Sequence, residues 1–393
     1  TTLMAVMANY PFCLAPVMGL NAYFAFTICA QKGYSWHVAL AAVFVEGIIF
    51  IVLSLTNVRE AIFNAIPMSL KSAVSVGIGL FVAFIGLQDA KIIVASSSTL
   101  VTYQNFHGEP AVTVGAILAL IGVLITAILL VKKVKGGILI GILATWVLGI
   151  ICELIGIYNP TAESGMPSTI PAGIISFDFS ALGNTFGAFL DVDFGSVNIG
   201  DMLVIIFSFL FVDMFDTIGT LIGVSSKADM LDENGKLPRI KPALLSDAIA
   251  TSVGAVLGTS TTTTYVESAS GVTAGGRTGL TAAVTAVLFL LAVIFSPLFL
   301  AIPSFAIAPA LITVGFYMMG SVVKINFEDP SEGIPAFLCI LAMPLAYSIS
   351  EGIVIGVISW TLINLITGKA KEKKISVLMY VLSILFVLKY IFL

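Results

Sequence analysis

The stretch LVIIFSFLFVDMFDTIGTLIGV, residues 203–224, is long and apolar enough to cross a lipid bilayer, yet it carries Asp213 and Asp216 near its middle. A charged carboxylate at the centre of a bilayer costs about 2.5–3.5 kcal/mol on insertion scales. Such residues persist where they face a cavity and have a partner. The stretch therefore predicts a membrane protein with a polar site inside it.

The composition of the whole chain supports this class. Its 393 residues are 59% hydrophobic and 10% charged, whereas about a quarter of the residues in a soluble domain are charged. The net charge of −4 is small, and there is no basic block suited to nucleic acid. The cysteines lie far apart without metal-ligand spacing, as Cys13, Cys29, Cys152 and Cys339. We expect one integral membrane unit without a nucleic-acid partner, a metal or a cofactor.

Apolar runs between polar breaks predict ten membrane spans. They lie near residues 37–55, 72–88, 111–131, 137–157, 202–224, 243–258, 279–300, 305–322, 333–349 and 351–367. Two shorter runs, 18–30 and 266–275, are rich in Gly, Ser and Thr. The apolar tail 375–393 is open between a further span and a helix on the surface.

The positions of the cations predict the orientation. All but Lys32, Lys91 and Lys389 gather in six loops, each separated from the next by two spans if both short runs count as crossings: Arg59 and Lys71; Lys132, Lys133 and Lys135; Lys227, Lys236, Arg239 and Lys241; Arg277; Lys324; and Lys369, Lys371, Lys373 and Lys374. Lys32 and Lys91 fall on the opposite side. The loop 158–200 contains no Lys or Arg. By the positive-inside rule, the six loops are cytoplasmic and 158–200 lies outside.

Two segments read as interrupted crossings. NYPFCLAPVMGLNAYFAFTICAQKG (9–33) and GTSTTTTYVESASGVTAGG (258–276) each place an extended, Pro- or Thr-rich stretch before a short helical run. Neither run reaches the roughly 20 residues of a full crossing. Extended backbone at membrane depth is tolerated only where it is buried in protein or lines a cavity. Paired interruptions of this kind point to a transporter site between inverted repeats.

The repeat pattern divides the chain into parts. We expect a first inverted repeat over 1–157, an extracytoplasmic loop over 158–200, a second repeat over 201–367, and a tail or surface helix over 368–393. The counterpart of Asp216 in the first repeat would lie about thirty residues before Thr1 by this logic. One helix and most of another are therefore expected to be missing at the N-terminus.

The carboxylates also have structural alternatives. Asp213 and Asp216 share a helix face and could cap a local break or bond neighbouring helices. Glu267 begins the second short run and could serve only as its N-terminal cap. For Glu46, within the span 37–55, a hydrogen bond between helices is favoured. As a site, two carboxylates beside the N–H groups of two half-helices suit a ligand with ring N–H donors and ring acceptors, and disfavour a simple anion.

Four motifs then resemble a known family. APVMGLNAYFAFT (15–27), YSWHVALAAVF (34–44), VDMFDTIGTLIGV (212–224) and GTSTTTTYVESASGVTAGGRTGLTA (258–282) resemble the AzgA-like purine permeases, a branch of the nucleobase–ascorbate (xanthine/uracil permease) superfamily. The likeness extends over nearly the whole chain. It implies an all-α polytopic fold of fourteen helices in two inverted repeats of seven, with a core domain and a gate domain.

The resemblance also implies a substrate site between the third and tenth helices, beside the eighth. It assigns Asp216 to the eighth-helix acid, Glu267 to the tenth-helix acid and Asn21 to the polar residue of the third helix. The ring contact would be Phe24, and weaker neighbours would be Thr217, Thr220 and Ser268.

We expect a secondary transporter, not an enzyme, that imports hypoxanthine, guanine or adenine with a proton by an elevator-like movement in a bacterial inner (plasma) membrane. Asp216 would couple to the proton and Glu267 would recognise the base, although these roles could be exchanged. The alternatives are an anion transporter or exchanger of the same fold, and a uracil/xanthine permease. A membrane-embedded enzyme is disfavoured because His37 and His107, the only histidines, have no ligand-spaced partner. A homodimer stays open.

Overall fold

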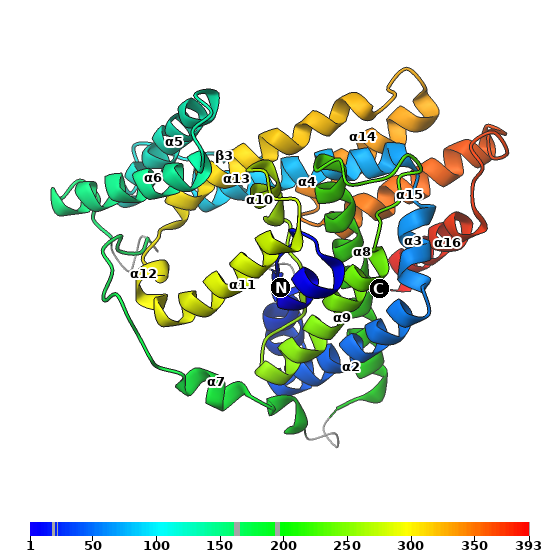
Figure 1. Cartoon of the computed structure of the whole chain (residues 1–393), viewed down its shortest axis with the longest axis horizontal. Coiled ribbons are helices and arrows are strands. Elements are labelled where there is room, and N and C mark those ends of the chain that lie inside the picture. Colours follow the sequence, from blue (N-terminus) through cyan, green and yellow to red (C-terminus); the bar gives the residue numbers. More distant parts are fainter. Residues whose placement is uncertain (18–19, 22, 161–165, 193–196, 393) are drawn as a thin grey trace.

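The computed structural model describes residues 1–17, 20–21, 23–160, 166–192 and 197–392. Within these residues the chain is mostly helical (Figure 1). Eight helical segments are long and apolar enough to cross a membrane: α2 (Trp36–Leu55), α4 (Met68–Asp89), α5 (Pro110–Val131), α6 (Gly137–Leu154), α8 (Ile199–Lys227), α9 (Ile240–Leu257), α13 (Ser304–Met319) with the 3-10 turn η5 (Gly320–Lys324), and α15 (Ile349–Ile366). They agree with eight of the ten predicted spans.

The other two predicted spans have different bounds. The span expected at 279–300 is divided at Phe295 into α11 (Gly279–Ile294) and α12 (Ser296–Leu300), because Pro297 is tolerated in a first turn but not in a helix interior. The span expected at 333–349 is α14 (Pro330–Leu345). It begins earlier because Asp329 caps it, accepting the N–H of Ser331 at 3.0 Å, and because proline suits the first helical position.

The two interrupted crossings meet as a small sheet. Strand β1 (Leu14–Pro16) pairs antiparallel with β4 (Thr262–Thr264), with Leu14 opposite Thr264. The π-helical segment η2 (Tyr23–Gln31) follows β1, and the six-residue helix α10 (Ser268–Thr273) follows β4. The predicted run 18–30 includes positions 18–19 and 22, which lie outside the described residues. The extended stretches predicted before both short runs are therefore strands.

Smaller elements complete the chain. They are η1 (Met4–Ala8), α3 (Val58–Ala65), the hairpin of β2 (Ile93–Ser96) and β3 (Leu100–Tyr103), α7 (Ser180–Thr185), η3 (Ala188–Leu190) and α16 (Val377–Phe392). The last of these is the apolar tail. Its Phe386 is fully buried, with its ring centroid 4.8 Å from that of Phe215 on α8, and Lys389 pairs with Glu351 on α15. Figure 1 shows α16 beside α3 at the edge of the molecule.

The helices pack in two groups. In what we call the α4 group, α4 contacts α13, α14 and α15, and α5 and α6 contact α13. In what we call the α8 group, α2 contacts α8 and α9, η1 contacts α9 and α11, and β4, which leads into α10, contacts α8 and α9. The groups meet where α8 lies against α4 and α15 and where α10 lies against α13.

Glycines allow the closest approach within the α4 group. A Cβ atom added to Gly315 on α13 would lie 2.4 Å from the carbonyl oxygen of Gly79 on α4. Small residues at such crossings are typical of helices that pack inside a bilayer, where close van der Waals contact replaces hydrophobic driving force.

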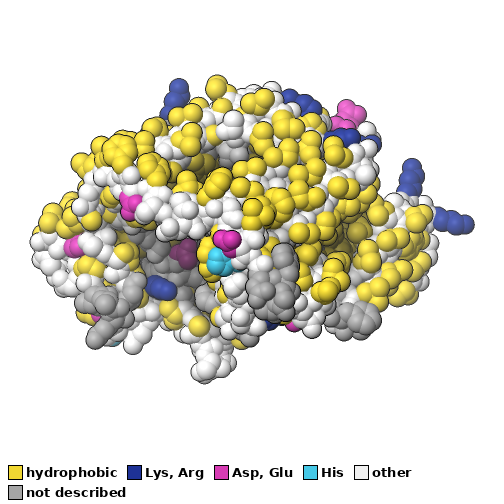
Figure 2. Space-filling view, turned by 90° about the horizontal axis from the view of Figure 1, so that it is seen from below, with side chains coloured by type: hydrophobic (Ala, Val, Ile, Leu, Met, Phe, Trp, Pro, Cys, Tyr) yellow, Lys and Arg dark blue, Asp and Glu magenta, His cyan; other side chains and the backbone are white. Residues whose placement is uncertain are grey.

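Apolar side chains also cover much of the outer surface. Leu124, Leu290 and Ile366 are 63%, 72% and 81% exposed. Figure 2 shows one face on which hydrophobic side chains predominate and charged ones are few. Such a surface suits lipid rather than water.

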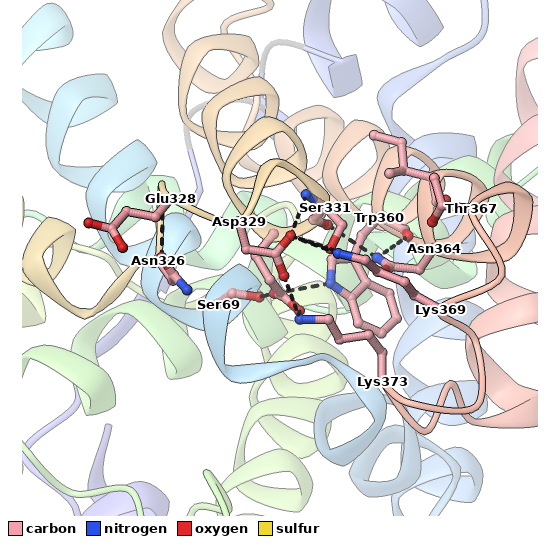
Figure 3. Close-up of polar contacts among 12 residues, drawn as sticks. Ser69, Asn326, Glu328, Asp329, Ser331, Trp360, Asn364, Thr367, Lys369 and Lys373 are labelled. Atoms are coloured by element: carbon pink, nitrogen blue, oxygen red, sulfur yellow. Dashed lines mark hydrogen bonds and ion pairs between the residues drawn. The ribbon is translucent and has the colours of Figure 1, made fainter.

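A charged network joins the starts of α4 and α14 to the end of α15 (Figure 3). Asp329 accepts hydrogen bonds from Lys369 at 3.1 Å and Lys373 at 2.9 Å. Glu332, in the first turn of α14, pairs with Lys373 at 3.0 Å and accepts hydrogen bonds from Ser69 and from the indole of Trp360. Lys369 and Lys373, both predicted in a loop, thus have their charges neutralised by carboxylates at the start of α14.

We expect Asp329→Asn to lower the melting temperature near neutral pH. Asparagine caps a helix about as well as aspartate, so the change reports on the lost charge. Hydrogen bonds from Lys373, Ser331 and Lys369 hold the pKa of Asp329 well below its usual range. A carboxylate with a lowered folded-state pKa stabilises the fold above its unfolded pKa of about 3.9, and this contribution is lost as the pH falls below that value. The difference in melting temperature should therefore shrink in acid.

Thermal melts of the purified protein across this pH range test the expectation. Asp229→Asn is the matched control, because Asp229 pairs with Lys324 while its side chain is 83% exposed, and such pairs contribute little. A difference between wild type and Asp329→Asn that is the same in acid as at neutral pH would contradict the assignment.

Candidate functional site

A cavity of about 210 Å³ lies between the two helix groups. The α8 group contributes residues of η2, of α8 and of the turn between β4 and α10, and the α4 group contributes residues of α4 and of the turn between α14 and α15. Its polar walls are Asp216, Thr220, Glu267 and Ser348, and its aromatic walls are Tyr23, Phe81, Tyr265 and Tyr347. Two of the predicted acids thus face one hollow.

Asp216 lies on α8 and is 8% exposed. Its Oδ1 accepts the backbone N–H of Ser350 at 3.1 Å. Ser350 is in the first turn of α15, where backbone N–H groups have no partner within the helix. This single hydrogen bond joins the α8 group to the α4 group at the edge of the cavity.

Glu267 occupies the cap position of α10, but its side chain accepts no hydrogen bond from that helix. Its Oε2 is buried and has no hydrogen-bond partner among the described residues. The alternative that Glu267 serves only as a cap is therefore wrong for the side chain, which lines the cavity and retains a buried acceptor without a described partner.

The other predicted site residues differ in position. Thr220 lines the cavity, whereas Asn21, Phe24, Thr217 and Ser268 are not among its described lining residues. Asn21 accepts a hydrogen bond from Ser260, and Phe24 packs beside a buried cluster of α2 and α8. Their role in binding stays a prediction.

Thr217 and Ser268 support the backbone behind the cavity. The hydroxyl of Thr217 donates to Asp247 Oδ2 at 3.1 Å. The hydroxyl of Ser268 accepts the backbone N–H of Cys13 at 2.9 Å. These bonds tie α8 to α9, and α10 to the residue before β1.

The aromatic walls were missed by sequence reasoning. Phe81 and Tyr347 meet edge to face with centroids 5.3 Å apart, although Phe81 lies on α4 and Tyr347 in the turn between α14 and α15, far apart in sequence. Tyr23 and Tyr265 lie within the quoted motifs, next to Phe24 and two residues before Glu267, so those motifs could have indicated them. Aromatic rings offer flat apolar faces to a planar ligand.

A second missed residue, Asp247 on α9, organises the strand that precedes Glu267. Its fully buried carboxylate accepts the N–H of Thr264 at 2.8 Å and the hydroxyl of Thr263 at 2.9 Å. Its other oxygen accepts from Arg59 at 2.9 Å. The signal was available, because Asp247 is a carboxylate inside the predicted span 243–258.

Two predicted loop cations are buried instead. Arg59 lies on α3, fully buried, because Asp247 pairs with its guanidinium and the ring of Phe50 lies 4.2 Å away. Lys71 is in the first turn of α4 and donates to the carbonyl of Gly235 at 2.6 Å. Arg59 thus still lies between the spans α2 and α4, as predicted, whereas Lys71, predicted in the same connection, lies inside α4.

Two further carboxylates lie behind the cavity. Glu46 is fully buried and accepts the hydroxyl of Thr261 at 3.0 Å, so the favoured hydrogen bond exists, although its donor precedes β4 rather than lying on a helix. Asp213 is fully buried, with Oδ1 lying 3.2 Å from the hydroxyl oxygen of Thr217 and with no described hydrogen-bond partner for Oδ2. Of the pair on α8, Asp216 alone lines the cavity within the described residues.

Known proteins are similar to this chain in sequence and in fold. The permease family (Xan_ur_permease) matches residues 1–355. The guanine/hypoxanthine permease PbuG of Bacillus subtilis is 48% identical over 394 residues, which cover 100% of this chain and 84% of PbuG. The adenine permease AdeP of Escherichia coli is 39% identical over 390 residues, covering 99% and 82%. The transmembrane domain of a cyanobacterium bicarbonate transporter, BicA, superposes with a TM-score of 0.56 at 15% identity, covering 91% of this chain and 88% of that one.

A mostly helical body with an apolar outer surface, and with a cavity between two helix groups that two carboxylates line, has the architecture of a membrane transporter. The chain belongs to the permease family. It is an integral, multi-pass membrane protein and not an enzyme, and the resemblance drawn from its motifs is confirmed. The likeness to BicA supports the fold alone.

We expect Arg59→Met to destabilise the protein strongly. The change leaves the fully buried Asp247 carboxylate without its ion partner, and breaking one side of a buried pair costs about 3–5 kcal/mol. Arg59→Met combined with Asp247→Asn should recover part of the loss, because the uncompensated charge is then gone.

The yield of monodisperse protein and its melting temperature measure this effect. Lys236→Met is the control, because Lys236 is exposed and is in no ion pair among the described residues. A double variant no more stable than Arg59→Met would argue against the pair as the cause.

Proposed function

We propose that this permease takes up purine nucleobases, namely hypoxanthine, guanine and adenine, as a secondary active transporter. The relatives named for guanine/hypoxanthine and for adenine cover nearly the whole chain at 48% and 39% identity. The cavity between the helix groups supports the same substrate class through its chemistry.

The observation that carries the proposal is the buried, unpartnered Oε2 of Glu267 in an aromatic cavity. A buried acceptor without a donor costs about 1–3 kcal/mol. A ring N–H of a purine would supply that donor, while the planar ring packs against Tyr265, Phe81 and Tyr347. Thr220 and Ser348 would serve the exocyclic group and ring nitrogens.

The alternatives fit the cavity less well. A simple anion would meet Asp216 and Glu267, while no Lys or Arg is among the described lining residues, so charge complementarity is absent. Uracil or xanthine would meet the same acceptors, but uracil lacks the second ring that the aromatic walls would contact. We therefore place simple anions and uracil after the purines, a class to which xanthine itself belongs.

Proton coupling would run through Asp216. In its ionised form the carboxylate attracts the N–H of Ser350, which lies at the positive end of α15. Protonation removes that charge, weakens the contact between the helix groups and lowers the cost of moving the site through an apolar slab. We infer proton symport, in which the α8 group slides against the α4 group in an elevator-like movement. Glu267 is the alternative proton carrier.

The pairing of the two interrupted crossings supports the proposed inverted repeats, 1–157 and 201–367. Each would contribute one interrupted crossing, and β1 and β4 are their matching strands, paired with each other at the repeat interface. The α8 group would be the core domain and the α4 group the gate domain. Asn21, Phe24, Thr217 and Ser268 would act as supporting residues of the core.

We expect Asp216→Asn and Glu267→Gln each to abolish concentrative uptake of labelled hypoxanthine by proteoliposomes with an imposed proton gradient. Glu267→Gln should also weaken equilibrium binding by at least about tenfold, or about 1.4 kcal/mol, because a base contact is lost. Asp216→Asn should retain equilibrium binding of hypoxanthine, because this change removes the group that couples transport to the proton.

Glu109→Gln is the control, since Glu109 is exposed at the start of α5 and its side chain caps nothing. Near-normal accumulation of hypoxanthine by both Asp216→Asn and Glu267→Gln, at equal protein levels, would contradict the proposed mechanism. Loss of binding in Asp216→Asn with retained binding in Glu267→Gln would exchange the two roles.

Competition between labelled hypoxanthine and unlabelled nucleobases tests which compounds are substrates. Unlabelled hypoxanthine, guanine and adenine should each displace labelled hypoxanthine at concentrations at least about tenfold lower than uracil, because a bicyclic ring covers more of the aromatic wall. Uracil or bicarbonate as the strongest competitor would overturn the purine assignment.

A further inference from the structure

A second, larger cavity of about 680 Å³ lies at the opposite end of α10 from Glu267. Its walls come from the turn between α5 and α6, from the ends of α8 and α10, and from α13. It therefore also lies between the α4 group and the α8 group. By the positive-inside pattern, its mouth faces the cytoplasm.

Cations gather around this cavity. Lys133, Lys135, Lys227 and Arg277 line it, and no carboxylate is among its described lining residues. The ion pairs within the described part of the chain include none of the four. The positive-inside rule explains cations on this face, but not their convergence on one hollow without an acid.

The nearby network of Asp329 makes the contrast clear. There, Lys369 and Lys373 lie against one carboxylate (Figure 3). Around the cavity, four cations instead line one hollow with no carboxylate among its described lining residues, which raises the local concentration of anions.

The individual groups are arranged to receive that anion. Arg277 donates from Nη1 to the carbonyls of Val272 and Gly276 at 2.6 and 2.8 Å, which holds its guanidinium beside the end of α10 and leaves its other N–H groups for a ligand. Lys227 Nζ lies 5.8 Å from the ring centroid of Tyr317. The buried hydroxyl of Thr273 lines the cavity without a hydrogen-bond partner in the described structure.

We propose that this cavity binds a phosphate-bearing anion, at a site separate from the purine site. Lys and Arg donors with a hydroxyl are the groups that bind phosphate oxygens through charge-assisted hydrogen bonds. The volume exceeds the needs of a bare phosphate, so the ligand carries an organic group. A nucleoside monophosphate and the headgroup of an anionic phospholipid share this chemistry.

The position of the cavity gives the anion a consequence for transport. Because the walls belong to both helix groups, a bound anion stabilises the arrangement in which those walls are adjacent. It therefore opposes movement of one group against the other and lowers uptake. This inhibition, but not the binding, rests on the proposed function.

The test uses the purified full chain in an uncharged detergent. Equilibrium dialysis with labelled guanosine monophosphate measures the nucleotide arm, and native mass spectrometry of retained phosphatidylglycerol, against phosphatidylcholine, measures the lipid arm. The test variant combines Lys133→Gln, Lys135→Gln and Lys227→Gln. The matched control combines Lys236→Gln, Lys371→Gln and Lys374→Gln, three exposed lysines predicted on the same face but outside the cavity lining.

We expect wild type and control to bind one of the two probes, and the test variant to bind it at least about tenfold more weakly. Binding of the nucleotide alone identifies a soluble ligand, and selective retention of phosphatidylglycerol alone identifies a lipid headgroup. Absence of both probes from wild type, or equal loss in test and control variants, overturns the proposal. Labelled hypoxanthine binding, measured in the same samples, should be unchanged in the test variant, so failure of the purine site is detected separately.

Discussion

Backbone groups inside a bilayer must find their partners within the protein, because an unpaired N–H or C=O in hydrocarbon costs several kcal/mol. Two chain segments here give up helical bonding in the middle of a crossing. They survive because β1 and β4 pair with each other and because the remaining donors are used nearby: Tyr265 donates its N–H to the carbonyl of Cys13 at 2.9 Å, and Thr264 donates to Asp247 at 2.8 Å. These bonds replace helical ones in the stretches that lead to the cavity.

Two of the buried acids, Asp247 and Glu267, differ in how fully their oxygens are used. Asp247 accepts from three threonine hydroxyls, a backbone N–H and Arg59, and a buried ion pair is tolerable only when such further hydrogen bonds satisfy it. Its role is to hold β4 against α8 and α9. Glu267, at the end of the same stretch, retains an unused buried oxygen. An acid with every acceptor filled is structural, whereas an acid with an open acceptor in a cavity is available to a ligand.

The sequence could reveal the features that local patterns determine, but not those that depend on which helices meet. The spans, the interrupted crossings and the acids Asp216 and Glu267 follow from local patterns, namely apolar length, Thr- and Pro-rich breaks and charge in an apolar run. The aromatic walls do not, because periodicity identifies an apolar face without indicating which helix will meet it. Phe81 is one of 27 phenylalanines. Arg59 looked like a loop cation because its partner, Asp247, is distant in sequence and the pairing depends on how α3 docks on α9.

The short helix α10 lies between the acidic cavity and the basic cavity. An acid precedes its first residue and Arg277 follows its end, an order that favours the helix electrostatically since its N-terminus is positive and its C-terminus negative. The same order places two carboxylates around one cavity and four cations around the other, with six helical residues between them. Both cavities have one wall in the α8 group and one in the α4 group. Any sliding of one group along the other must therefore change the acidic and the basic cavity together, so occupancy of either one alters the free energy of that movement.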